Sequence, residues 1–123
     1  MLPKDNRLKK SSDIDIVFAH GRSVYGNFLA CRLWRIVPSN FPKRGYDKDM
    51  LKVAVVVGKK VHKSAVQRNV IKRKMREVLR LLLKEGSVPA GYLFVFFAKP
   101  TILGRSYQEI ATDITQVIAR AKL

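Results

Sequence analysis

The spacing of apolar residues predicts three helices along the chain. The stretch 64–85 contains no proline or glycine, and its apolar residues recur three and four positions apart, which predicts a long amphipathic helix ending at Gly86. A shorter pattern predicts a first helix that is capped at Ser12 and Asp13 and ends at Gly21. A third helix is predicted from Ser106 or Tyr107 onward. Its expected buried stripe comprises Ile110, Ile114, Val117, Ile118 and Ala121.

Strand-forming residues dominate the stretches between these helices. Residues 23–37 are predicted to be extended until Pro38. Residues 50–57 carry apolar side chains on both faces, which predicts a central strand, and the run YLFVFFA at 92–98 fits a strand buried on both faces. The order helix, three strands, helix, strand, helix predicts an α/β (α+β) two-layer sandwich with a mixed central sheet, formed by one domain over residues 1–123.

Composition adds a large positive charge to this picture. The 123 residues include 25 Lys and Arg against 9 Asp and Glu, a net charge of +16, while 47% hydrophobic residues indicate a folded domain. Such a charge favours a polyanionic partner. No apolar run approaches the roughly 20 residues of a membrane span, and the N-terminus lacks the apolar core of a secretory signal. We therefore expect a cytoplasmic protein with no membrane partner, and a lone Cys31 excludes an internal disulfide.

The charge is concentrated around the long helix. Residues 59–76 hold eight of the 25 basic residues and no acidic one, and a helical wheel places the basic side chains opposite the apolar stripe. Solvated helix faces normally mix both signs of charge, so this pattern favours nucleic-acid binding over simple solvation. The predicted contacts are Lys59, Lys60, Lys63, Arg68, Asn69, Lys72, Arg73, Arg76 and Arg80.

Catalytic motifs are missing from the sequence. Gly58 and Lys59 do not form a phosphate-binding loop, because Val53 stands where such a loop has its first glycine. His20 and His62 have no metal-ligand spacing. We predict no catalytic residue, no metal ligand and no small-molecule substrate. An exposed aromatic would favour RNA over DNA; Phe18 is such a candidate, and a core position explains it equally well.

The segments 53–61 (VAVVVGKKV) and 65–77 (AVQRNVIKRKMRE) resemble the signature of the bacterial ribonuclease P protein component. In that family a strand ends in Lys-Lys, and the next helix opens with Arg-Asn-Arg followed by Ile-Lys-Arg. This chain departs from the pattern at Val70, which takes the place of the third signature residue. The resemblance extends over nearly the whole chain through Arg7, Leu8, Phe18, Gly21, Ser23, Lys99 and Pro100.

The resemblance implies a subunit of an endoribonuclease that is inactive alone. It would bind a large catalytic RNA through the basic helix and assist the Mg²⁺-dependent removal of the 5′ leader from precursor tRNA, with Mg²⁺ held mainly by the RNA. It also implies a left-handed crossover through that helix, and a leader-binding cleft between the sheet and the first helix. The cleft residues it implies are Ile14, Phe18, Leu29 and Cys31. A ribosomal or other architectural RNA-binding protein with no role in cleavage is the alternative. A DNA-binding module is disfavoured, because no short helix precedes the basic one to form a helix-turn-helix.

Overall fold

The computed structural model describes residues 2–123, in which four strands form one mixed sheet. The strands are β1 (Arg22–Tyr25), β2 (Leu29–Arg35), β3 (Leu51–Val56) and β4 (Tyr92–Ala98), and they lie in the order β1-β2-β4-β3. β2 is antiparallel to both β1 and β4, whereas β3 runs parallel to β4. The predicted mixed α+β class and the predicted order of elements are confirmed.

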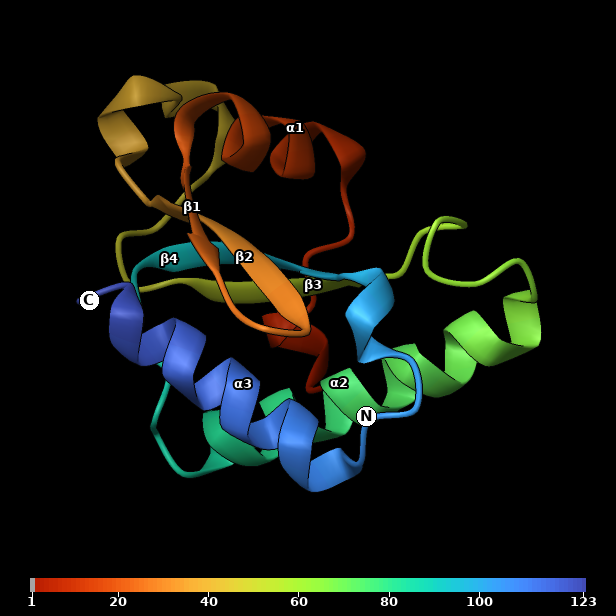
Figure 1. Cartoon of the computed structure of the whole chain (residues 1–123). Coiled ribbons are helices and arrows are strands. Elements are labelled where there is room, and N and C mark those ends of the chain that lie inside the picture. Colours follow the sequence, from red (N-terminus) through yellow and green to blue (C-terminus); the bar gives the residue numbers. More distant parts are fainter. Residues whose placement is uncertain (1) are drawn as a thin grey trace.

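Helices cover both faces of this sheet (Figure 1). α1 (Ser11–His20) lies against one face, and α2 (Ala65–Lys84) and α3 (Tyr107–Arg120) lie against the other. The described chain therefore has three layers rather than the predicted two. α2 connects the parallel strands β3 and β4, and the left hand of this crossover stays a prediction. Short 3-10 helices lie at Lys4–Asn6, Pro38–Asn40, Pro42–Arg44 and Pro100–Ile102.

An apolar cluster holds each face of the sheet to its helices. On the side of α2 and α3, Phe94, Phe96 and Met75 are at most 1% exposed. On the side of α1, Trp34 and Leu93 belong to the buried cluster. Successive side chains of a strand point to opposite faces, so β4 contributes to both clusters. Its predicted burial on both faces is confirmed.

Side chains cap the starts of α2 and α3, close to where the sequence predicts these helices to begin. Ser64 caps α2 by accepting a hydrogen bond from the backbone N–H of Gln67 at 3.4 Å. Ser106 and Glu109 form a reciprocal capping box at the start of α3. The first helix differs, because it begins at Ser11 without a side-chain cap. Asp13, predicted as part of that cap, instead binds Arg44 and Tyr46.

β3 lies at the edge of the sheet, which corrects its predicted central position. Its outward side chain Val56 is 41% exposed, so apolar residues on both faces did not indicate burial on both faces. Residues 2–8, which we call the N-terminal strap, cross the outer edge of β3. Leu2 packs in the cluster on the side of α2 and α3, and Leu8 packs in the cluster on the side of α1. The strap pairs with β3 at Val53, whose carbonyl accepts a hydrogen bond from the Leu8 N–H at 3.0 Å.

A buried carboxylate ties the β1–β2 turn to α3. Asp113 is 2% exposed and accepts hydrogen bonds from the backbone N–H groups of Asn27, Phe28 and Leu29, at 2.8, 2.9 and 3.2 Å. The turn residue Gly26 lies so close that an added Cβ would be 2.6 Å from the Asp113 carboxylate. This anchor, which the sequence analysis did not identify, fixes the hairpin that carries Tyr25.

Candidate nucleic-acid interface

The first half of α2 projects beyond the sheet (Figure 1). Ile71 is the first buried residue of the helix, and Val66, in the first turn, is 69% exposed. Asn69, Arg73 and Arg76 are exposed, as the helical wheel predicted. Among the described residues, no side-chain hydrogen bond or salt bridge engages the guanidinium groups of Arg73 and Arg76. Both are therefore available to an external anion.

Two predicted arginines of α2 are already engaged within the protein. Arg68 donates from Nη1 to the backbone carbonyls of His62 and Lys63, at 3.0 and 2.9 Å, so it holds the loop before the helix. Arg80 forms a two-pronged ion pair with Glu77, with 2.6 Å between Nη2 and Oε1. The hydrogen bonds from Arg80 lower the pKa of the Glu77 carboxyl. Arg80 lies on the predicted face, but its charge is offset by this partner.

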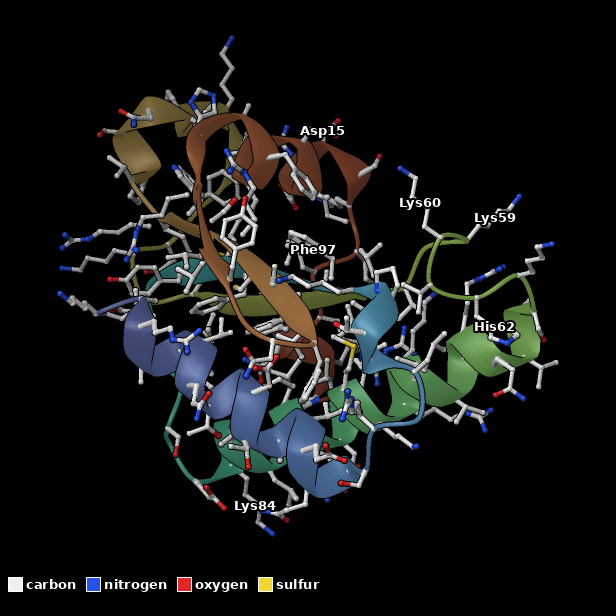
Figure 2. The ribbon with its side chains drawn as sticks, viewed as in Figure 1. Asp15, Lys59, Lys60, His62, Lys84 and Phe97 are labelled. Atoms are coloured by element: carbon white, nitrogen blue, oxygen red, sulfur yellow. The ribbon has the colours of Figure 1, made fainter. Side chains whose placement is uncertain are left out.

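The loop between β3 and α2 adds lysines to the same end of the molecule. Lys59, Lys60 and Lys63 are exposed, and Figure 2 shows Lys59 and Lys60 pointing away from the ribbon. His62 helps to hold this loop, because its Nδ1 accepts a hydrogen bond from the Ser64 backbone N–H at 2.9 Å. We call the resulting set the cationic surface: Lys59, Lys60, Lys63, Asn69, Lys72, Arg73 and Arg76.

A row of apolar residues crosses the sheet on the side of α1. Tyr25, Ala30, Phe97 and Val56 are direct cross-strand partners on β1, β2, β4 and β3, so their side chains share one face. Val24, the neighbour of Tyr25 on β1, points into the cluster on the side of α2 and α3. Tyr25 and its three cross-strand partners therefore face the α1 side, and we call these four residues the aromatic row. Figure 2 shows Phe97 there. Tyr25 is 61% exposed and Phe97 is half-buried, whereas Ala30 between them is fully buried.

The last turn of α1 borders the aromatic row. Phe18 is 45% exposed, and its carbonyl accepts hydrogen bonds from Arg32 Nε and Nη2, at 3.0 and 2.7 Å. Arg32 also donates to the Ser23 hydroxyl at 2.8 Å, which fixes α1 against β1 and β2. The Lys99 ammonium lies 5.5 Å from the centre of the Tyr25 ring. This surface therefore combines exposed aromatic faces with positive charge, the combination that suits unpaired bases.

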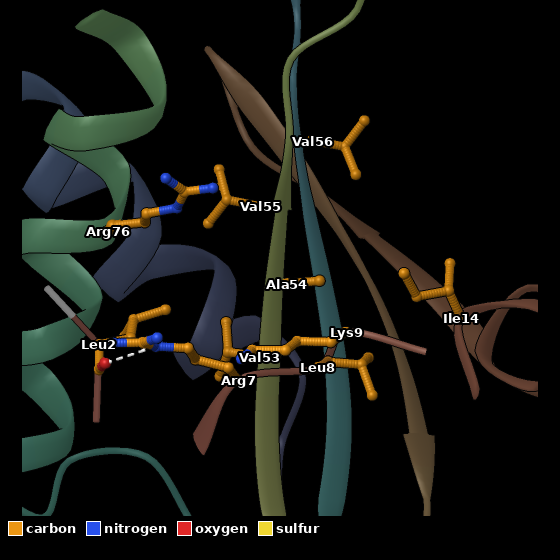
Figure 3. A pocket seen from close by; sticks show the side chains of 10 residues that line it. All are labelled: Leu2, Arg7, Leu8, Lys9, Ile14, Val53, Ala54, Val55, Val56 and Arg76. Atoms are coloured by element: carbon orange, nitrogen blue, oxygen red, sulfur yellow. Dashed lines mark hydrogen bonds between the residues drawn. The ribbon is translucent and has the colours of Figure 1, made fainter. Parts of the chain in front are cut away.

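A pocket of about 350 Å³ separates the two surfaces, at the outer edge of β3 (Figure 3). Arg76 of α2 and Arg7 of the N-terminal strap extend along one side of the strand, and Ile14 and Val56 lie on the other. Arg7 Nε donates to the Leu2 carbonyl at 2.9 Å. Arg76 thus belongs both to the cationic surface and to the wall of this pocket.

The chain matches a known protein family over nearly its whole length. The family model for Ribonuclease P covers residues 2–122. The chain belongs to the ribonuclease P protein family. It is 32% identical over 123 residues to the ribonuclease P protein component of Pseudanabaena sp. (strain PCC 6903), covering 100% of this chain and 97% of the relative. It is 33% identical over 117 residues to that of Clostridium kluyveri, covering 95% of both.

Solved structures share the fold. The ribonuclease P protein of Staphylococcus aureus superposes with a TM-score of 0.75 at 23% identity, covering 97% of both chains. That of Thermotoga maritima gives 0.72 at 20% identity, covering 93% of this chain and 96% of the other. As a ribonuclease P protein, the chain is the RNA-binding protein subunit of an endoribonuclease of tRNA processing, whose RNA carries the activity.

The placement of two leader-cleft residues implied by the family resemblance is wrong. Leu29 and Cys31 are 0% and 1% exposed and lie in the cluster under α2 and α3, on the far face from α1. Burial raises the pKa of the Cys31 thiol. The residues of β2 that face α1 alternate with Leu29 and Cys31 along the strand, and they include Ala30 and Arg32. The sequence held a signal for this, because the charged Arg32 does not fit a buried face.

The other two predicted cleft residues lie on the expected side. Phe18 is exposed beside the aromatic row, so the alternative of a core position is wrong. Ile14 is half-buried, packs against the cluster under α1 and lines the pocket at the β3 edge. Tyr25, Phe97 and Val56 complete the surface, and the sequence analysis did not place them together because only the strand register does so.

Metal-binding side chains are not gathered in the part of the chain that the structure describes. Within residues 2–123, no three His, Cys, Asp or Glu side chains lie close enough together to hold a metal ion. That the RNA holds the Mg²⁺ of the reaction stays a prediction. None of the helices over the same residues has the length and apolar character needed to cross a membrane.

Proposed function

We propose that this chain binds the catalytic RNA of ribonuclease P through the cationic surface and the single-stranded 5′ leader of precursor tRNA through the aromatic row. The observation that carries the proposal is the presence of two chemically different surfaces on one ribonuclease P protein. One offers charge with no exposed aromatic ring, and the other offers exposed aromatic rings.

The cationic surface suits a folded RNA. Arginine presents its donors in a planar fork that matches phosphate oxygens, and lysine adds mobile point charges. Arg73 and Arg76 are exposed and free of described partners, so phosphate binding does not require breaking an internal ion pair. Contacts of this kind fix position and orientation without reading sequence.

The aromatic row suits the leader because an unpaired strand exposes its base faces. Stacking on an aromatic side chain contributes about 1–3 kcal/mol per base and tolerates any sequence. Tyr25 and Phe97 lie on the same face of the sheet, and Lys99 and Arg32 supply positive charge beside them. A leader held here would discriminate precursor from mature tRNA, which has no leader.

In this proposal the RNA holds the Mg²⁺ that the cleavage requires. The side chains of the cationic surface neutralise phosphates of the catalytic RNA, and those beside the aromatic row neutralise phosphates of the leader. This lowers the repulsion between two polyanions that divalent ions must otherwise screen. The protein therefore assists cleavage at low Mg²⁺ by binding and orienting the substrate.

Paired substitutions test the two surfaces separately. Arg73→Ala should weaken binding of the catalytic RNA whether or not a leader is present. Tyr25→Ala should weaken binding of precursor tRNA to the assembled complex and leave mature tRNA unaffected, while Tyr25→Phe, which keeps the ring, should retain most of the affinity.

Matched controls are available on other parts of the surface. Arg35→Ala removes an exposed arginine at the end of β2, and Tyr107→Ala removes a tyrosine that is 37% exposed on α3. Both should bind like the unsubstituted protein. Equal losses for precursor and mature tRNA with Tyr25→Ala would contradict leader binding at the aromatic row.

A further inference from the structure

A second concentration of positive charge lies at the opposite end of β3 from the cationic surface. The N-terminal strap, the first turn of α1, the loop 38–50 and the start of β3 enclose a pocket of about 560 Å³. Seven cationic side chains line it against two carboxylates. Its lysines come from separate parts of the sequence and are Lys4, Lys9, Lys10, Lys43 and Lys52.

These lysines have little internal compensation. Among residues 2–123, no hydrogen bond or salt bridge engages the ammonium groups of Lys4, Lys9, Lys43 or Lys52, and the first three of these residues are exposed. Folding therefore brings like charges together that are far apart in the sequence, at a cost in repulsion. An anion bound in the pocket would remove that repulsion.

One of the two carboxylates of the pocket is already committed. Asp13 accepts hydrogen bonds from Arg44 Nη2 and from the Tyr46 hydroxyl, both at 2.6 Å. Partial burial alone would raise the pKa of Asp13, but these bonds and the charges of Arg44 and Lys10 outweigh it and lower the pKa. The Asp13 charge thus fastens the loop to α1 and offsets Arg44, which leaves Asp5 as the one other carboxylate of the pocket against its five lysines and Arg7.

The pocket offers charge without a free aromatic face. The Tyr46 ring packs edge-on against Trp34 and Phe41, with ring centres 5.4 and 6.3 Å away, and its hydroxyl is bound to Asp13. Lysine ammonium groups bind phosphate as point charges and do not read bases. The chemistry therefore selects a phosphate backbone rather than an unpaired base.

The pocket is distinct from the cationic surface but connected to it. Lys52 lies near the start of β3, about 13 Å along the strand from its last residue, Val56, beyond which Lys59 and Lys60 follow. Arg7 and Lys9 line both this pocket and the pocket at the β3 edge, whose wall includes Arg76 (Figure 3). Positive charge thus continues from α2 around the outer edge of β3.

We propose that this pocket, the strap pocket, is a second phosphate-binding site that takes the backbone of an RNA while α2 holds the catalytic RNA. The inference rests on the proposed function, because it assumes that the partner is the ribonuclease P RNA with its substrate. It extends that function by adding an anchoring point where the strap, α1 and the loop 38–50 meet.

The test compares Lys4→Ala/Lys43→Ala with Arg73→Ala and with a control pair, Arg35→Ala/Lys84→Ala, in which both residues are also exposed. Binding to the catalytic RNA, with and without precursor tRNA, is measured across a range of salt concentrations. Removal of one phosphate-binding side chain should reduce the slope of log affinity against log salt by about 0.7 to 0.9. For the lysine pair we expect a reduction of about 1.4 to 1.8, twice the value for a single phosphate, and for the control pair none.

The outcomes separate this inference from the proposed function. If the lysine pair leaves the slope unchanged while Arg73→Ala reduces it, the strap pocket is not an RNA site and the proposed function stands. If Arg73→Ala has no effect, catalytic-RNA binding by α2 is wrong. Combining all three substitutions should add the slope changes, because the sites do not overlap, and a combined effect no larger than that of either set would contradict two separate sites.

A second arm distinguishes RNA from a small phosphate ligand. ATP at millimolar concentration, with Mg²⁺ held constant, should not displace the RNA from the unsubstituted protein. Should ATP bind with an affinity that falls in Lys4→Ala/Lys43→Ala while RNA binding does not change, the pocket would be a site for free nucleotides and the proposal would be overturned.

Discussion

Replacing Asp113 should be among the most damaging single changes in this protein. Its carboxylate is 2% exposed and is the acceptor for the backbone N–H groups of Asn27, Phe28 and Leu29. In Asp113→Ala all three donors lose this acceptor. Asn27 is exposed, so its N–H can donate to water instead, whereas Leu29 is fully buried and Phe28 is half-buried. A buried donor without a partner costs about 1–3 kcal/mol, so two such donors predict a loss of about 2–6 kcal/mol.

Asp113→Asn separates the shape of this side chain from its charge. The two costly donors, Phe28 and Leu29, share Oδ2, whereas Asn27 donates to Oδ1. An asparagine that places its single carbonyl oxygen at the Oδ2 position keeps both costly bonds and turns its amide toward the Asn27 N–H. We therefore expect a smaller loss, about 1–2 kcal/mol, for Asp113→Asn.

Urea denaturation followed by circular dichroism measures these losses. The neighbouring exposed Thr112→Ala is the control and should stay within about 0.5 kcal/mol of the unsubstituted protein. Amide exchange at residues 27–29 should speed up in Asp113→Ala, because these amides lose their acceptor. A loss below about 1 kcal/mol for Asp113→Ala, or equal losses for both variants, would refute the role assigned to this carboxylate.

Three further predictions concern the other features of the structure. The buried Cys31 thiol, the single cysteine of the chain, should resist alkylation in the folded protein and react only as the chain unfolds; rapid labelling under native conditions would contradict its placement. Phe18→Ala should weaken binding of precursor tRNA more than that of mature tRNA with little change in the urea midpoint, since the ring is 45% exposed; a large loss of stability without loss of selectivity would show a core role. Because the folded-state pKa of Asp13 is lowered, its contribution is present at neutral pH and is lost as the pH falls from the ordinary aspartate value, about 3.9, through the folded value. Asp13→Asn should therefore be less stable than the unsubstituted protein at pH 7, and the difference should shrink toward pH 2; a constant difference would contradict the charge-assisted bonds to Arg44 and Tyr46.

The helices on the side of α2 and α3 could be predicted because their signals are local. Ser64 and Ser106 cap the helices that they precede, and the apolar stripe of α2 sets which arginines face solvent. Phosphate-binding candidates such as Arg73 follow directly from that stripe. What the sequence could not show is that Glu77 offsets Arg80 and that Arg68 holds backbone carbonyls, because these depend on side-chain conformation.

The sheet was harder to predict because strand register decides which face a residue occupies. A shift of one residue exchanges the two faces, so Leu29 and Cys31 were placed on the α1 side where Ala30 and Arg32 lie. The aromatic row and the strap pocket also join segments far apart in the chain. Neither can be read from local spacing, since contacts between distant segments create them.

In the proposed function, this chain assists a catalytic RNA in removing the 5′ leader of precursor tRNA. The most direct measurement is the rate of leader removal by the ribonuclease P RNA across a Mg²⁺ titration, with and without the purified chain. We expect no cleavage by the chain alone, and a shift of the RNA's activity to lower Mg²⁺ when the chain is added. If the titrations with and without the chain coincide, the proposed function is wrong.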